Sequence, residues 1–181
     1  MPDKKIIGLV GQIACGKGAI AKYAKKNYDA STYKFSSIIR DVLDRLHIEK
    51  SRENLSKLST LLRTNFGEDT FAKVMAKDVS EDNHNLVIVD GIRRMKDIEY
   101  LNKLPNFKLV RIVVDPKIRY DRLLSRNENK GDDHKTYEEF LADQNKEADA
   151  EVPEVMQHAD IEIDNNGSWE EFNEKIKKLL D

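Results

Sequence analysis

Short apolar runs alternate with longer amphipathic segments along this chain. Four of the runs are rich in β-branched residues and nearly free of charge, as expected of buried strands. They cover residues 6–10, 86–89, 109–114 (interrupted by Arg111) and 161–163, and a weaker run covers 31–35. The segments between them carry apolar residues at helical spacing. Strands that alternate with helices predict an α/β fold with a parallel sheet covered on both faces.

Local helix signals lie where this alternation requires them. Asp115-Pro116 provides an N-cap residue followed by a proline at the first helical position. Two capping boxes predict further helix starts, at Thr136-x-x-Glu139 and at Ser168-x-x-Glu171. In the last helix one apolar stripe predicts core packing; it consists of Trp169, Phe172, Ile176 and Leu179.

Two segments depart from the simple alternation. Residues 51–79 predict two helical stretches, broken near Gly67, between the second and third strands. Residues 127–135 are polar and charged and contain Gly131, which predicts a loop between two helices.

Composition narrows the class of protein. The 181 residues suffice for one domain with a sizeable core. A formal charge of -2 argues against a protein that mainly grips nucleic acid. A single cysteine excludes an internal disulfide framework, and no apolar run approaches the ~20 residues of a membrane helix. We therefore expect a cytoplasmic protein, without nucleic-acid or membrane partners, that is a monomer or a small homo-oligomer.

A phosphate loop follows the first predicted strand. Gly11-Gln-Ile-Ala-Cys-Gly16-Lys17-Gly18 matches G-x-x-x-x-G-K, directly before a helical segment. Glycines let backbone N–H groups turn toward phosphate oxygens, and the positive end of the helix dipole favours the same anion. The residues predicted to bind the donor nucleotide here are Gly11, Ala14, Cys15, Gly16, Lys17, Gly18 and Ala19. Lys17 is also predicted to act in catalysis through its charge on the β- and γ-phosphates.

A carboxylate for Mg²⁺ is predicted at Asp90. Gly18 stands where a serine or threonine hydroxyl commonly binds the metal, and Ala19 does not restore that hydroxyl. A bound Mg²⁺ would then be held by phosphates, water and a carboxylate. Asp90 ends the apolar run that begins at Leu86, the pattern of an acidic residue beside the metal.

Arginines gather near the ends of the predicted strands. Guanidinium groups suit bidentate phosphate contacts and stabilise charge on a transferring phosphoryl group. Arg122 and Arg126 are four residues apart and share a helical face. The others are Arg40, Arg63, Arg93, Arg94 and Arg119.

These motifs resemble those of the nucleoside-monophosphate kinase group, to which adenylate kinase belongs. Gly16-Lys17-Gly18 is similar to the end of that group's phosphate loop, and Asp90-Gly91-Ile92-Arg93-Arg94 is similar to its Asp-Gly-Phe-Pro-Arg. Asp121-Arg122 with Arg126 matches the start of its lid, and Arg40 matches its arginine after the second strand. A little-characterised group of small adenylate-kinase-like proteins also shares the Val-Asp-Gly-Ile-Arg stretch and the tail 159–167.

The resemblance covers nearly the whole chain and implies a P-loop kinase fold. It implies a five-stranded parallel sheet in a single domain 1–181, an acceptor-binding helical insert at 36–80, and a lid at 127–135. ATP and Mg²⁺ would be the cofactors. Arg122 and Arg126 would act on the transferring phosphate, and Asn165, Asn166 and Gly167 would lie near the adenine. The acceptor would be bound by Ser36, Arg40, Arg63, Gly91, Arg93 and Arg94.

The acceptor itself stays open. We expect a small phosphorylated molecule, with a nucleoside monophosphate first. The tail 159–168 is also similar to that of dephospho-coenzyme-A kinase, the main alternative. That enzyme phosphorylates a hydroxyl and uses an aspartate after the second strand as a base, whereas this chain has Phe35-Ser36-Ser37 there. A phosphate acceptor is already anionic and needs no base, so the absence of an aspartate after the second strand favours a phosphate acceptor over a hydroxyl acceptor. Ser37 also stands where adenylate-kinase-like proteins often have aspartate.

Two other function classes were weighed. Asn129-Lys-Gly-Asp132 matches the guanine-reading N-K-x-D pattern, but it lies in a polar loop instead of ending a strand, so a coincidence explains it better. A nucleotide-binding ATPase or switch with little kinase turnover stays open because of Gly18, Ala19 and Ser37. The preference for ATP over GTP is not decided by these residues.

Overall fold

The computed structural model of the chain describes residues 4–126, 135–144 and 149–181. Its five parallel strands form one sheet in the order β2-β3-β1-β4-β5. They are β1 (Lys5–Val10), β2 (Ser31–Lys34), β3 (Leu86–Ile92), β4 (Phe107–Val113) and β5 (Ile161–Asp164). The five predicted strands are confirmed. One end differs in a way that matters for the site: β3 continues past Val89 through Asp90 and Gly91.

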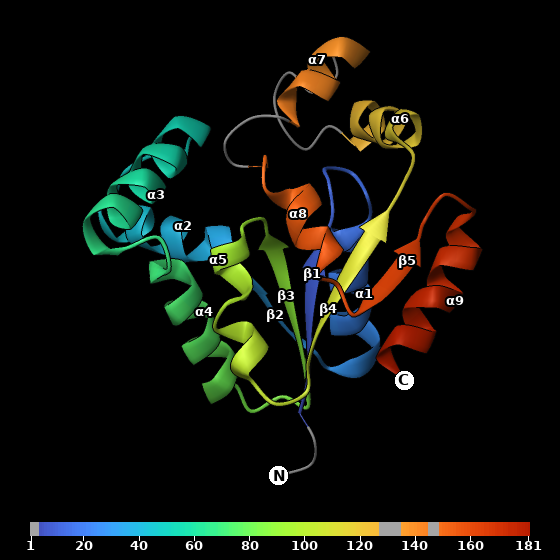
Figure 1. Cartoon of the computed structure of the whole chain (residues 1–181), viewed down its shortest axis with the longest axis horizontal. Coiled ribbons are helices and arrows are strands. Elements are labelled where there is room, and N and C mark those ends of the chain that lie inside the picture. The colour runs from blue at the N-terminus through green and yellow to red at the C-terminus, as the bar shows by residue number, and fades with distance from the viewer. Residues whose placement is uncertain (1–3, 127–134, 145–148) are drawn as a thin grey trace.

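Helices connect the strands and cover both faces of the sheet (Figure 1). In chain order they are α1 (Lys17–Tyr28), α2 (Phe35–Arg45), α3 (Arg52–Phe66), α4 (Thr70–Glu81), α5 (Met95–Ile98), the 3₁₀ turn η1 (Leu101–Lys103), α6 (Pro116–Arg126), α7 (Tyr137–Asp143), α8 (Val152–Gln157) and α9 (Trp169–Leu180). The predicted break near Gly67 is confirmed, because Gly67 ends α3 with a φ of 105°.

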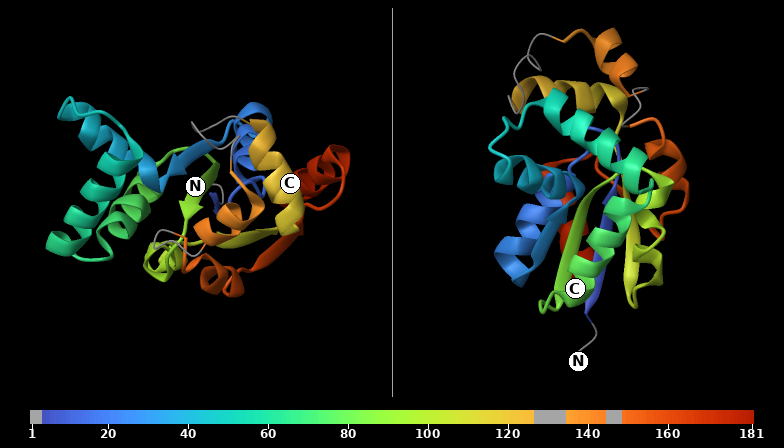
Figure 2. Two further views of the ribbon diagram at one scale, coloured as in Figure 1. Left: turned by 90° about the horizontal axis from the view of Figure 1, so that it is seen from above. Right: turned by 90° about the vertical axis from the view of Figure 1, so that its left-hand side faces the viewer.

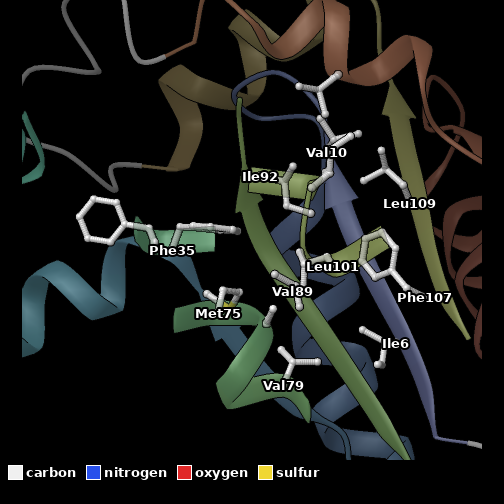
Figure 3. Packing of buried hydrophobic residues seen from close by; sticks show 14 of the residues in the cluster. Ile6, Val10, Phe35, Met75, Val79, Val89, Ile92, Leu101, Phe107 and Leu109 are labelled. Atoms are coloured by element: carbon white, nitrogen blue, oxygen red, sulfur yellow. The ribbon is translucent and has the colours of Figure 1, made fainter. Parts of the chain in front are cut away.

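The strands alternate between two apolar cores. In β1, Ile6 and Val10 face the core built with α2, α4, α5 and α8, which Figure 3 shows from close by. Ile7 and Leu9 face the opposite core, built with α1 and α9. Because successive residues of a strand point to opposite faces, an apolar run buried on both sides fits this central position.

Three of the predicted helix starts are formed as the sequence indicates. The Lys117 N–H donates to Asp115 Oδ1 (2.8 Å), and both capping boxes have their two reciprocal hydrogen bonds. The predicted stripe of α9 is wrong at one position. Phe172, Ile176 and Leu179 are buried, but Trp169 is 57% exposed. Trp169 is the first residue of its helix, and its ring is tilted against that of Phe172, with the ring centroids 5.9 Å apart.

The carboxyl ends of the strands lie between two helical projections. α2, α3 and α4 extend to one side and α6 with α7 lies above the sheet, as the views of Figures 1 and 2 agree. α2 to α4 occupy the place of the predicted acceptor-binding insert at 36–80, although α2 already starts at Phe35. The insert, the lid and the single-domain division stay predictions. Residues 127–134 of the predicted lid lie outside the described residues.

Candidate phosphoryl-transfer site

The loop between β1 and α1 curls around the side chain of Lys17. Ala14 and Gly16 both adopt positive φ angles, of 60° and 113°, which turns the backbone sharply before the helix begins. The Lys17 ammonium donates to the carbonyl oxygens of Gly11 (2.5 Å) and Gln12 (3.1 Å). The loop therefore holds a cation at the positive end of the α1 dipole, an arrangement that suits an anionic ligand.

Two of the three loop glycines are sterically required. A Cβ at Gly11 would lie 2.7 Å from Cys15 Sγ and 2.8 Å from the Ile112 carbonyl oxygen. A Cβ at Gly16 would lie 2.7 Å from Asn165 Nδ2. At Gly18, by contrast, a Cβ would meet nothing within 4 Å. Packing therefore does not require a glycine at position 18. The consequence of Gly18 is that the loop lacks the serine or threonine hydroxyl that commonly binds the metal at this position.

The other loop residues take supporting places. Cys15 is buried, with Sγ 3.6 Å from Lys17 Nζ, and it belongs to the core beneath α1. Ala19 packs against that same core. This fits a small packing residue at position 15 better than an exposed reactive thiol.

Asp90 lies beside the loop because β3 is the neighbour of β1. It is 9% exposed, and its Oδ1 accepts a hydrogen bond from the Gly91 N–H (2.7 Å). Gly91 has a φ of 85°. Among the described residues, no group of three or more His, Cys, Asp or Glu side chains gathers that could hold a metal alone. Asp90 thus fits a metal bound mainly through phosphate oxygens and water.

The sequence analysis missed Lys34, which stands next to Asp90. Lys34 ends β2 and is the register partner of Asp90 on β3. Its Nζ lies 3.9 Å from Asp90 Oδ2, and its side chain is 58% exposed. The parallel pairing of β2 with β3 would have suggested this neighbour, because Lys34 lies at the carboxyl end of β2 beside Asp90 on β3.

Three of the arginines predicted to bind the acceptor are already paired with carboxylates. Arg63 is buried, with Nη2 3.4 Å from Asp97 Oδ1 and Nη1 donating to the Glu68 carbonyl oxygen (2.6 Å). Arg94 Nη1 lies 3.3 Å from Glu68 Oε2, and Arg93 Nη1 lies 3.1 Å from Asp149 Oδ1.

These pairs bear on how an acceptor could bind. Asp97 also accepts the backbone N–H groups of Arg93 and Arg94, both at 3.0 Å, so it fixes the turn after β3. An acceptor phosphate would have to compete with carboxylates for these three guanidinium groups. Ser36 and Arg40 lie on α2 and are exposed, so they are open to a ligand.

The tail after β5 contacts the phosphate loop directly. Asn165 is buried, and its Nδ2 donates to the Cys15 carbonyl oxygen (2.9 Å). Arg122 of α6 donates to the Asn165 carbonyl oxygen (3.0 Å). Asn166 Oδ1 accepts the N–H of Asp115 (2.7 Å), and Gly167 is exposed. Asn165 therefore contacts the loop backbone, Arg122 is linked to the loop through Asn165, and Asn166 contacts Asp115 before α6.

A buried arginine of α6 is a second residue that the sequence analysis did not assign to the site. Arg119 is 1% exposed, its burial lowers its pKa, and its Nη1 lies 3.5 Å from the Ile13 carbonyl oxygen of the loop. The signal was its spacing: Leu123, four residues later on the same helical face, is also buried. Arg126 is the last residue of α6, and the rest of the predicted lid follows it.

No helix in the described residues is long and apolar enough to span a bilayer.

Comparisons with known proteins agree with this geometry. A family model described as an AAA domain matches residues 10–141. A UPF0200 protein of Pyrococcus abyssi is 33% identical over 180 residues, which covers 97% of this chain and 95% of that protein.

Two solved kinases share the fold. Shikimate kinase from Bacteroides thetaiotaomicron has a TM-score of 0.62 and 18% identity, covering 97% of this chain and 96% of that one. Dephospho-CoA kinase from Campylobacter jejuni has a TM-score of 0.57 and 16% identity, covering 97% of this chain and 94% of that one. At such identities the likeness concerns the fold, which is the P-loop kinase fold. The 33% identity to the relative in Pyrococcus abyssi, over 97% of this chain, shows that the chain belongs to the UPF0200 family.

Proposed function

We propose that this chain is an ATP-dependent phosphotransferase that moves the γ-phosphate to a small phosphorylated acceptor, with a nucleoside monophosphate as the first choice. The observation that carries the proposal is the meeting of three strand ends. The loop of β1 presents Lys17, β3 presents Asp90, and β2 presents Lys34 at 3.9 Å from that carboxylate.

The donor side follows from the loop. Lys17 and the backbone N–H groups at the start of α1 would hold the β- and γ-phosphates of ATP. Mg²⁺, when bound beside Asp90, would reduce the charge repulsion between donor and acceptor. Arg122 and Arg126, both on α6, would stabilise charge on the transferring group.

The acceptor side is supported by the sign of the charge at the end of β2. A hydroxyl acceptor gains from a carboxylate base at this place, whereas a phosphate needs only to be positioned against its own negative charge. Here the end of β2 carries Lys34, and Ser37 is occupied by a hydrogen bond to the Lys34 carbonyl oxygen (2.6 Å). A lysine there favours an acceptor that is already anionic, with exposed Arg40 as a further ligand.

The proposal is tested by coupled ADP release with ATP and Mg²⁺ across a panel of acceptors. The panel contains AMP, CMP, UMP, GMP, dTMP, dCMP, dephospho-coenzyme A and shikimate. We expect a clear response to one monophosphate. A response only to dephospho-coenzyme A or shikimate would replace the proposal with a hydroxyl kinase, and acceptor-independent ADP release would favour an ATPase or switch. Lys17→Met controls for contaminating kinases.

Lys34 provides a sharper second test. Once the acceptor is identified, Lys34→Met should raise the KM for that acceptor by about tenfold or more, because a charge-assisted contact with its phosphate is lost. The KM for ATP should change by no more than about twofold. Lys108→Met is the matched control, because Lys108 is also an exposed strand lysine (56%) that lies near one carboxylate (3.3 Å). Equal effects of the two substitutions would argue against the acceptor role.

A further inference from the structure

The phosphate loop is held from outside by two side chains that come from distant parts of the chain. Arg119 belongs to α6, and Asn165 follows β5 directly. Both are buried, and both donate to carbonyl oxygens of the loop instead of facing a ligand pocket.

Among the described residues, the hydrogen bonds of the buried Arg119 guanidinium all go to neutral acceptors. Its Nε donates to the Val114 carbonyl oxygen (3.2 Å), its Nη1 to that of Ile13 (3.5 Å) and its Nη2 to Gln144 Oε1 (3.0 Å). In the part of the chain that the structure describes, no carboxylate forms an ion pair with it. Burying a charge without a counter-charge is costly, so a nearby anion would complete this environment.

The geometry of the peptide bond gives these contacts a consequence. In a trans peptide, the C=O of one residue and the N–H of the next point in opposite directions, and the described residues contain no cis peptide bond. Holding the Ile13 carbonyl toward α6 therefore turns the Ala14 N–H away from α6. Holding the Cys15 carbonyl toward Asn165 likewise turns the Gly16 N–H away from the tail.

Both of these amides are available to a ligand. Within the described residues, neither the Ala14 N–H nor the Gly16 N–H donates to another protein group. Ala14 is also held at a φ of 60°, a conformation that disfavours L-residues and persists where the surroundings impose it. The contact at Ile13, the preceding residue, is a source of that constraint.

We propose that Arg119 and Asn165 are positioning residues that clamp the outer carbonyls of the phosphate loop and thereby aim the Ala14 and Gly16 amides at a bound polyphosphate. The inference rests on the proposed function only in that the loop binds the phosphates of a nucleotide. The inference assigns Asn165 a role in positioning the loop around the phosphates. The resemblance to known kinases implies instead that Asn165 lies near the adenine.

Arg119 extends the clamp to the helix that follows the lid segment. Gln144 follows the last residue of α7, and the Arg119 guanidinium lies over the ring of Phe140, 5.2 Å from its centroid. The side chain of Arg119 therefore connects the backbone of the phosphate loop with α6 and α7. Loss of the Arg119 side chain should therefore both loosen the phosphate loop and remove its connection to α7.

The clamp is tested by calorimetric binding of ADP and of inorganic pyrophosphate, each with Mg²⁺, to Arg119→Met, Arg119→Lys and Asn165→Ala. Pyrophosphate carries the phosphates without the base. We expect Arg119→Met and Asn165→Ala to weaken both ligands by the same factor, about 10- to 100-fold, the usual range for losing a buried hydrogen bond. Arg119→Lys should restore little, because an ammonium lacks the planar fork that reaches three acceptors. Arg111→Met is the matched control, because it removes an ion pair with Glu162 and a hydrogen bond to the Met156 carbonyl oxygen, neither of which involves the loop.

Three results would overturn the clamp. A loss of ADP affinity with unchanged pyrophosphate affinity would mean that Asn165 reads the base. Wild-type affinity for both ligands, with only a lower Tm, would mean a purely structural role. Full recovery in Arg119→Lys would mean that charge alone matters. If Arg119→Met does not fold, Asn165→Ala carries the test. Absence of acceptor-dependent turnover with intact pyrophosphate binding would reject the proposed function but leave the clamp standing.

Discussion

Replacing Gly16 by alanine should damage the phosphate loop in two separable ways. The first is conformational: a φ of 113° is favourable only for glycine, and an L-residue held there costs on the order of 1–3 kcal/mol. The second is steric. The new Cβ would lie 2.7 Å from Asn165 Nδ2 and 3.0 Å from the Phe172 ring, so the Asn165 amide must move off the Cys15 carbonyl.

The magnitude follows from these two effects. Leaving the buried Cys15 carbonyl without its donor costs about 1–3 kcal/mol, so the total destabilisation is roughly 2–6 kcal/mol. For a chain of this size each kcal/mol lowers Tm by about 2–4 °C, which gives a fall of roughly 4–24 °C. Binding of ADP should weaken by about tenfold or more, because the loop amides lose their orientation.

Gly18→Ala is the matched control. Its Cβ would meet nothing within 4 Å, and alanine at a compatible helical position stabilises by roughly 0.5–1 kcal/mol. Thermal unfolding followed by circular dichroism, with calorimetric titration of ADP, measures both substitutions. A Gly16→Ala protein with the Tm and ADP affinity of the wild type would refute the reasoning. So would a Gly18→Ala protein that is equally damaged.

Three further predictions concern charge. Lys17→Met should lower turnover by on the order of 10²-fold or more, measured by steady-state kinetics, because the donor phosphates lose their main cation; near-normal turnover would reject the site. Asp97→Ala should destabilise by about 3–5 kcal/mol in urea unfolding, since it takes from the buried Arg63 its nearer carboxylate and leaves only Glu68 at 3.9 Å; a loss below about 1 kcal/mol would mean that the pair is not formed. Burial works to raise the pKa of Asp82, but hydrogen bonds from His84, Tyr33 and Ser31 outweigh it and lower the pKa to about 2. Because this folded-state pKa lies below the ordinary value of 3.8, the group stabilises the fold above about pH 4 by about 2 kcal/mol, and the contribution is lost between about pH 4 and 2. Asp82→Asn should flatten that limb of the stability curve in acid titrations, and an unchanged limb would contradict the assignment.

The centre of the sheet was predictable because β1 and β3 are buried on both faces. A run such as Ile6 to Val10 has few alternatives to a central parallel strand, and the phosphate loop after it is a local backbone motif. The same holds for the capping boxes, whose hydrogen bonds join residues only three positions apart. These features depend on neighbours in sequence, which a single sequence displays.

The parts that were missed depend on neighbours in space. Arg63 looks like any arginine in the sequence, and only the fold shows that Asp97 and Glu68 already hold it. Lys34 gains meaning from its register with Asp90, and Arg119 from the carbonyl of Ile13. Ionic side chains select partners by tertiary geometry, so composition and spacing indicate a cationic site but not which cations are free within it.

The hydrogen bond between Asn165 and Cys15 also sets an order of assembly. It joins residues 150 positions apart in the sequence, and chains are synthesised from the N-terminus at about 5–20 residues per second. The loop motif therefore leaves the ribosome several seconds before the residue that secures it, by the same rate. Until β5 docks on β4, the motif is complete in sequence but lacks its supporting contact. A nucleotide that binds the completed loop, as proposed above, would stabilise the finished fold by mass action.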